Sequence, residues 1–121
     1  MTVAYFVVAG LLAALYLFSG GIKVVRSRDR LRPMMQWVDT MPLAAVRAIG
    51  LLEVAGAVGL ILPPVTGVLP PLAFAAAVGL VLVQIGAIAL HLRRGEIRVT
   101  GFNAVLLVLA VVAAWLATIW L

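Results

Sequence analysis

Four stretches of the chain, each about 20 residues long, are almost free of charged side chains. They cover residues 3–22, 43–62, 71–91 and 102–121. A helix rises about 1.5 Å per residue, so each stretch is long enough to cross a hydrocarbon layer roughly 30 Å thick. Lipid offers the backbone no hydrogen-bond partners, and each span must therefore close its own bonds as a helix. The sequence predicts an all-α, polytopic membrane four-helix bundle, antiparallel and up-down-up-down, forming a single transmembrane domain over residues 1–121.

The composition excludes a water-soluble domain of this length. Hydrophobic residues make up 66% of the chain, which leaves too little polar surface to cover a soluble core. The net charge of +5 invites a nucleic-acid interpretation, but the basic residues flank apolar spans and form no groove. We therefore predict contact with membrane lipids, whose anionic headgroups would meet these cations, and no contact with nucleic acid. The chain has no cysteine, which excludes a disulfide framework and thiolate metal sites.

The distribution of charge predicts how the helices lie in the membrane. Five basic residues follow the first span and three follow the third, whereas the joint at residues 63–71 carries no charge. The positive-inside rule then puts both termini outside the cytoplasm of a bacterial-type inner membrane. Proline pairs at residues 63–64 and 70–71 should break the helix on either side of a short turn.

The long first joint mixes cationic and apolar side chains. Its basic residues lead into a segment that contains Pro33, Met35 and Trp37. This mixture is typical of a segment lying in the headgroup layer. A solvated loop that only carries the topology signal stays the alternative.

Glu53 is the most informative polar residue, because burying an ionisable group in hydrocarbon is costly. Such a residue is usually paired with another polar group or has a function. It lies about 15 Å along the second span, near the midplane of the membrane. Gly50, Gly56 and Ala57 neighbour it by helical rotation, and such small residues let another helix approach closely. We expect the carboxylate to face the interior of the bundle.

Two other helices present polar faces at a similar depth. Tyr16, Ser19 and Lys23 share one stripe of the first helix, and Gln84 and His91 share a face of the third. We predict a polar pocket open to the cytoplasm, with Lys23 and His91 at its mouth. Glu53 should lie within one side chain or one water molecule of at least two of Tyr16, Ser19 and Gln84. The alternative is that these groups only satisfy one another as interhelical hydrogen bonds. The predicted ligand-binding residues are Tyr16, Ser19, Lys23, Glu53, Gln84 and His91.

The outer half of the bundle should be packed by alanine and leucine and closed by the proline turn. On the third helix, Ala75, Gly79 and Gly86 lie opposite Gln84 and are predicted to form a packing seam.

Several other chemistries are excluded. One histidine cannot supply bis-histidine haem ligation, and no carboxylate and histidine cluster supports a metal site. Ser19 has only Lys23 one turn away as a possible activating group, which is a weak signal for nucleophilic catalysis. Phosphate-loop and dinucleotide fingerprints are absent from the sequence. We therefore predict no catalytic residue and no metal ligand.

Short motifs occur in order through most of the chain. They are FSGGIK at residues 18–23, GLLEVAGA at residues 50–57, Leu62-Pro63 at the outer end of the second span, an Ala- and Gly-rich third span, and HLRRGE at residues 91–96. These motifs and their order resemble those of the DoxX-like family of small four-helix membrane proteins. The family pattern picks out Ser19, Gly20, Lys23, Glu53, Gly56, Pro63 and His91.

That resemblance implies a four-helix bundle and a link to redox systems. Family members include the small membrane subunit of a thiosulfate:quinone oxidoreductase and proteins linked to oxidative stress. We predict an accessory or quinone/lipid-binding subunit of a membrane oxidoreductase or stress-response system, rather than an enzyme on its own. Quinone is the one candidate cofactor. The candidate partners are a quinone or other apolar ligand, another protein, and further copies of the chain. A proton-coupled small-molecule transporter and a membrane scaffold or assembly factor stay open as alternatives.

Overall fold

The computed structural model describes residues 1–31, 33, 35, 42–95 and 97–121, and it is built from helices. The four-residue helix α2 (Arg28–Leu31) follows the first long helix, and a 3₁₀ turn, η2 (Thr118–Trp120), lies near the C-terminus. The described residues contain no strand, so the predicted all-α class is confirmed. The predicted interfacial position of Trp37 lies outside the described residues. The long helices are α1 (Thr2–Val25), α3 (Leu43–Thr66), α4 (Leu72–Arg93) and α5 (Ile97–Ala117).

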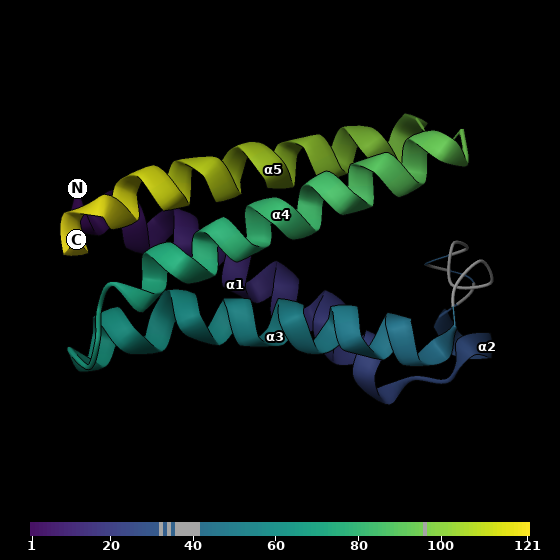
Figure 1. Ribbon diagram of the computed structural model, residues 1–121, viewed down its shortest axis with the longest axis horizontal. Helices are drawn as coiled ribbons and strands as arrows, with labels where there is room; N and C mark the ends of the chain where they lie inside the picture. Colours follow the sequence, from purple (N-terminus) through teal and green to yellow (C-terminus); the bar gives the residue numbers. More distant parts are fainter. Residues whose placement is uncertain (32, 34, 36–41, 96) are drawn as a thin grey trace.

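The long helices form an antiparallel bundle, as predicted. Helix α1 packs on α3, α3 on α4, α4 on α5 and α5 back on α1. Figure 1 shows the N- and C-termini together at one end of the bundle and α2 at the other. It also shows α3 and α4 diverging from the turn that joins them toward the end that carries α2.

The outer surface of the bundle is apolar. Many large hydrophobic side chains point outward, for example those of Val7, Leu51 and Val108, which are 58–61% exposed. All four long helices are long and apolar enough to cross a membrane. The chain is therefore a multi-pass membrane protein whose outward side chains contact lipid.

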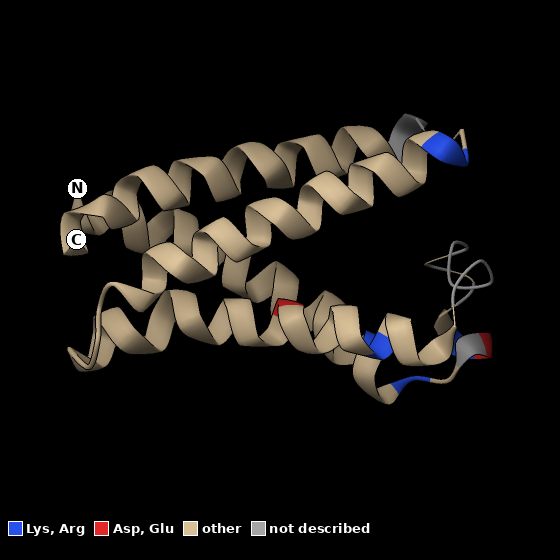
Figure 2. Ribbon diagram, in the orientation of Figure 1, with Lys and Arg blue, Asp and Glu red and all other residues tan. Residues whose placement is uncertain are grey.

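Charge gathers at one end of this apolar body. Figure 2 shows the lysine and arginine residues at and near the end opposite the termini, and an acidic residue midway along α3. We call this end the basic end and the opposite one the terminal end.

Alanine and leucine fill the half of the bundle toward the terminal end. Ala9, Leu12, Leu60, Ala77 and Ala110 have at most a trace of exposed surface and belong to one core cluster with contributions from all four long helices. Alanine lets the helix backbones approach closely, and leucine fills the space between them. The predicted packing of this half is confirmed.

The prediction that Pro63 and Pro64 end the second span is wrong, because α3 continues through both prolines to Thr66. Pro64 has no N–H group, so the carbonyl of Leu60, four residues earlier, lacks its donor within the helix. The Tyr5 hydroxyl of α1 donates to that carbonyl instead, at 2.6 Å. The helix ends only at Gly67, whose left-handed backbone (φ 74°) terminates it.

We expect Tyr5→Phe to lower the free energy of unfolding by about 1–3 kcal/mol, because it leaves the buried Leu60 carbonyl without a donor. Unfolding by heat or by sodium dodecyl sulfate in detergent micelles would measure the loss. In a Pro64→Ala background the new backbone amide can bond the same carbonyl, so Tyr5→Phe should then cost much less. An equal cost in both backgrounds would show that Tyr5 does not compensate for the proline.

Candidate functional site

Two facing glycines set the distance between α1 and α3. A Cβ on Gly20 would lie 2.6 Å from the carbonyl oxygen of Gly50, and a Cβ on Gly50 would lie 2.7 Å from Cβ of Lys23. Both distances are far below van der Waals contact, so only glycine permits this crossing. A Cβ on Gly56 would likewise lie 2.7 Å from a leucine of α4. The close approach predicted at the small residues around Glu53 is confirmed.

Lys23 and Glu53 form a buried ion pair across this crossing. Helix α1 runs to Val25, past the predicted end at residue 22, so Lys23 belongs to the helix and not to the joint. Its Nζ donates to Oε1 of Glu53, and the two side chains are only 8% and 3% exposed. An unpaired charge at this place would be strongly unfavourable, and the pairing cancels the two charges.

Arg47 of α3 donates hydrogen bonds to backbone carbonyls at the C-terminal end of α1. Its guanidinium donates to the carbonyl of Val24, and a longer contact of 3.5 Å reaches the carbonyl of Lys23. The last carbonyls of a helix have no partner within the helix, and a cation there also meets the negative end of the helix dipole. Arg47 therefore helps to hold the turn that carries Lys23. Nothing in the sequence pairs residues 23 and 24 with residue 47 before the helices are packed.

A second polar contact joins α1 to α4. The Gln84 Nε2 group donates to the hydroxyl oxygen of Tyr16, and these residues are 3% and 1% exposed. Tyr16 precedes Lys23 by two helical turns, so this contact lies closer to the terminal end than the ion pair does. It marks the boundary between the Ala–Leu core and the polar half of the bundle.

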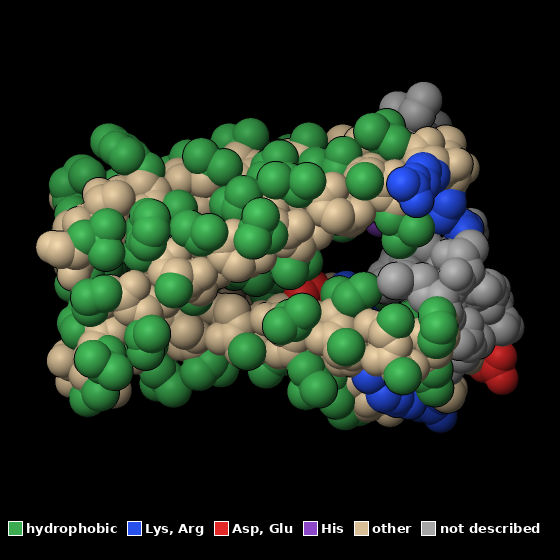
Figure 3. All heavy atoms as spheres, in the orientation of Figure 1, with side chains coloured by type: hydrophobic (Ala, Val, Ile, Leu, Met, Phe, Trp, Pro, Cys, Tyr) green, Lys and Arg blue, Asp and Glu red, His purple; other side chains and the backbone are tan. Residues whose placement is uncertain are grey.

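A cavity of about 800 Å³ lies in the polar half, between the α1–α3 pair and the α4–α5 pair. This volume is within the range of small-molecule sites in proteins. Figure 3 shows it as a hollow between α3 and α4 that opens on the lipid-facing side of the bundle, with an acidic side chain at its edge. Most lining residues are apolar. The polar ones are Tyr16, Ser19, Lys23, Glu53, Gln84, His91 and Asn103.

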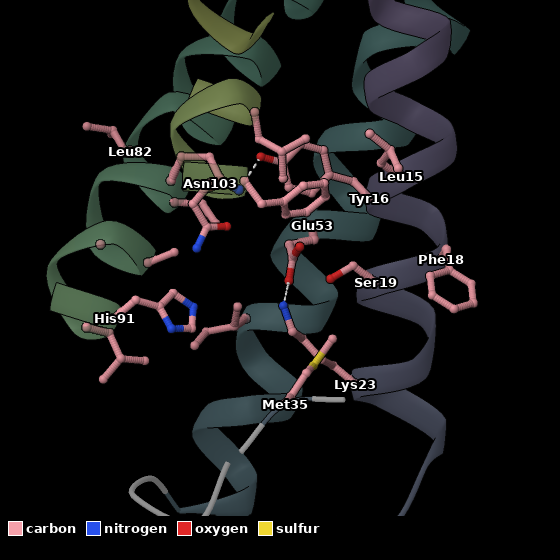
Figure 4. A pocket seen from close by; sticks show the side chains of 18 of the residues that line it. Leu15, Tyr16, Phe18, Ser19, Lys23, Met35, Glu53, Leu82, His91 and Asn103 are labelled. Carbon is pink, nitrogen blue, oxygen red and sulfur yellow. Dashed lines mark hydrogen bonds and ion pairs between the residues drawn. The ribbon is translucent and has the colours of Figure 1, made fainter. Parts of the chain in front are cut away.

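The polar side chains occupy two facing walls. Ser19, Lys23 and Glu53 come from α1 and α3, whereas His91 and Asn103 come from α4 and α5. Figure 4 shows the His91 ring and the Asn103 amide pointing across open space toward the ion pair. A polar group that enters the cavity would meet the ion pair on one side and an imidazole and an amide on the other.

Two buried amide groups keep an atom without a hydrogen-bond partner among the described residues. These atoms are Oε1 of Gln84, an acceptor, and Nδ2 of Asn103, a donor. The two residues are 3% and 7% exposed, and both line the cavity. A buried polar atom without a partner costs about 1–3 kcal/mol. Each amide would therefore gain from a polar group bound in the cavity.

The structure brings all six predicted site residues to this one cavity, but it pairs them differently. The sequence predicts Lys23 at the mouth of the pocket, whereas in the structure its side chain forms an ion pair with Glu53. Tyr16 bonds to Gln84. Asn103 is missing from the predicted set. The sequence signal that could have identified it is an amide side chain within an apolar span, and the structure shows that this side chain is buried. Ligand binding by these residues stays a prediction.

The predicted packing seam on α4 is wrong. Ala75, Gly79 and Gly86 are exposed, and a Cβ on either glycine would meet nothing within 4 Å. Helix α4 packs through the opposite face, which carries Gln84. The amide must be shielded from lipid, so its face turns inward and Ala75 and Gly79, on the opposite face, are left on the outside.

The donor set of the cavity suits an organic molecule better than a metal ion. Among the residues that the structure describes, no three His, Cys, Asp or Glu side chains come together as metal ligands would. The groups present are two amides, two hydroxyls, an imidazole and an ion pair. They can orient a head group by hydrogen bonds while the apolar lining receives a tail.

The model of the DoxX-like family matches residues 7–113, a range that includes every residue lining the cavity. Neither the curated proteins nor the solved structures give a significant match.

Proposed function

The chain belongs to the DoxX-like family, and from this and its cavity we propose that it binds a lipid-soluble molecule of the quinone or lipid class, as an accessory subunit of a membrane oxidoreductase or stress-response system. The observation that carries the proposal is the pair of unpartnered buried amide atoms, on Gln84 and Asn103, in a mainly apolar cavity. They supply specific contacts for a head group, and the apolar lining supplies space for a hydrocarbon tail.

The position of the cavity supports a ligand that arrives through the bilayer. The hollow between α3 and α4 opens on the side of the bundle, where lipid surrounds the helices (Figure 3). A water-soluble substrate would have to cross the headgroup layer to reach it, whereas a quinone or a lipid already resides at this depth.

Each polar residue has a part in this proposal. Asn103 donates to an oxygen of the head group through its unpartnered Nδ2, and Gln84, held by Tyr16, offers its unpartnered carbonyl oxygen as an acceptor. Ser19 and His91 add contacts on the two walls. The ion pair of Lys23 and Glu53 forms a polar surface without net charge. Such a site holds and orients its ligand, and the redox step then belongs to a partner protein.

The packing of the terminal half favours binding over transport. Leu12, Leu60 and Leu80 are at most 1% exposed and lie in the core between the cavity and the terminal end. A transporter would have to open this core during every cycle, and small alanine and leucine contacts of this kind make a packed barrier rather than a passage.

Ligand content in mild detergent tests the proposal. We expect mass spectrometry of organic extracts to find a quinone or a lipid in stoichiometric amount with the wild-type protein. With Asn103→Leu, which removes one buried hydrogen-bond donor, we expect about tenfold less. Val108→Ala, at an exposed position of α5 away from the cavity, is the matched control and should keep the wild-type amount. Equal ligand content in all three proteins would contradict the site. A protein recovered in stoichiometric amount without any small molecule would favour a scaffold.

We also propose that the basic end faces the cytoplasm of a bacterial-type inner membrane, with both termini on the other side, because the lysine and arginine residues gather at that end (Figure 2). Thr66→Cys, at the end of α3 beside the uncharged turn, should react with an impermeant maleimide added to intact cells. Ser27→Cys should react only after the cells are opened. Both positions are exposed, and the chain has no cysteine of its own, so the wild type is the blank. The reverse labelling pattern would overturn this orientation.

A further inference from the structure

We infer that the head group bound in the cavity is uncharged and carries both a hydrogen-bond donor and a hydrogen-bond acceptor, as an alcohol or a quinol does. This inference rests on the proposed function of the cavity and narrows its ligand class. It is carried by the two amide atoms that lack partners and by the charge balance of the facing wall.

The amides require opposite partners. Gln84, which lines the cavity, has its Nε2 group committed to the Tyr16 hydroxyl, and this contact leaves Oε1, an acceptor, without a partner. Asn103 presents Nδ2, a donor. A ketone, an ether or an ester can satisfy only Asn103, because these groups have no hydrogen to donate. A hydroxyl group can donate to Gln84 and accept from Asn103, so a hydroxyl-bearing head group leaves neither amide unpaired.

The charge balance argues against an ionised head group. Lys23 and Glu53 lie together on one wall, and their charges cancel. The opposite wall carries the Asn103 amide and the His91 ring. A fatty-acid carboxylate would bring an additional negative charge close to Glu53 in a site largely removed from water, where an uncompensated charge is strongly unfavourable. The cavity therefore favours a neutral polar head.

Three probes with the same saturated tail separate these requirements. Dodecan-1-ol donates and accepts, methyl dodecyl ether only accepts, and dodecanoate is an anion. We would measure the dissociation constant of each by displacement of tritiated dodecan-1-ol from the protein in phosphatidylcholine nanodiscs. We expect the ether and the anion to bind about tenfold more weakly than the alcohol, which is the effect of one buried acceptor left unpaired or one charge left uncompensated.

Two variants assign the preference to the amides. Gln84→Leu removes the acceptor and should bring the alcohol and the ether within about twofold of each other. Asn103→Leu removes the donor that both probes use, so it should weaken both and preserve their ratio. Thermal unfolding of each variant shows whether the bundle is intact, and the Asn103 variant tests the inference even where the Gln84 variant does not fold.

The outcomes separate the inference from the proposed function. An ether that binds as tightly as the alcohol would mean that Gln84 turns its amide hydrogens to the cavity, and a dodecanoate that binds most tightly would mean that the site is cationic. Either result overturns the inference and leaves a lipid-binding cavity standing. Failure of all three probes to bind the folded protein would overturn the proposed function itself.

Discussion

Glu53→Leu should lower the free energy of unfolding by about 3–5 kcal/mol. The substitution leaves the Lys23 ammonium buried between α1 and α3 without its counter-charge, in a half of the bundle surrounded by lipid. Lys23→Met should be destabilising for the same reason, because it leaves the carboxylate alone. Reversible unfolding in mixed micelles of mild detergent and dodecyl sulfate would measure each loss.

The double variant Lys23→Met with Glu53→Leu is the control. It removes both charges and replaces them with apolar side chains, so it should recover most of the stability that either single variant loses. Glu53→Gln keeps a hydrogen-bond acceptor for Lys23 and should preserve the fold while it abolishes ligand binding. If the two single losses simply added in the double variant, the ion pair would not be the source of the effect.

Gly50→Ala should lower the free energy of unfolding by about 1–3 kcal/mol, although alanine is the better helix former. The added methyl group would lie 2.7 Å from Cβ of Lys23 and 2.8 Å from the backbone oxygen of Gly20, so α1 and α3 must move apart. The same movement pulls Lys23 away from Glu53. Because the ion pair lines the cavity, this variant should also bind ligand more weakly.

Gly79→Ala is the matched substitution on the lipid-facing side of α4. A Cβ at this position would meet nothing within 4 Å, so only the higher helix propensity of alanine counts. We expect this variant to be as stable as the wild type or more stable by about 0.5–1 kcal/mol. The same unfolding assay compares the two alanine variants directly. A loss at position 79 as large as that at position 50 would show that the effect is not the close crossing.

The number, approximate position and antiparallel order of the long helices follow from the sequence alone. Lipid forces every apolar span of about 20 residues to close its own backbone hydrogen bonds, so hydropathy determines the secondary structure directly. The same rule identifies Glu53 and Gln84, because polar side chains in such spans must turn away from lipid. For this reason the six predicted residues meet in one cavity even though their pairings could not be predicted.

The ends and the contacting faces of the helices were decided by tertiary structure. Helix α3 passes through Pro64 because a hydroxyl from α1, 55 residues away in sequence, bonds the carbonyl that the proline leaves without a donor. Helix α1 extends past residue 22 where Lys23 finds its counter-charge on α3 and where Arg47 bonds the carbonyls at its end. On α4, the inward face is the one that carries Gln84 and not the one that carries Gly79. In each case the deciding interaction joins two helices, so its free energy exists only after they pack, and no local pattern in the sequence can report it.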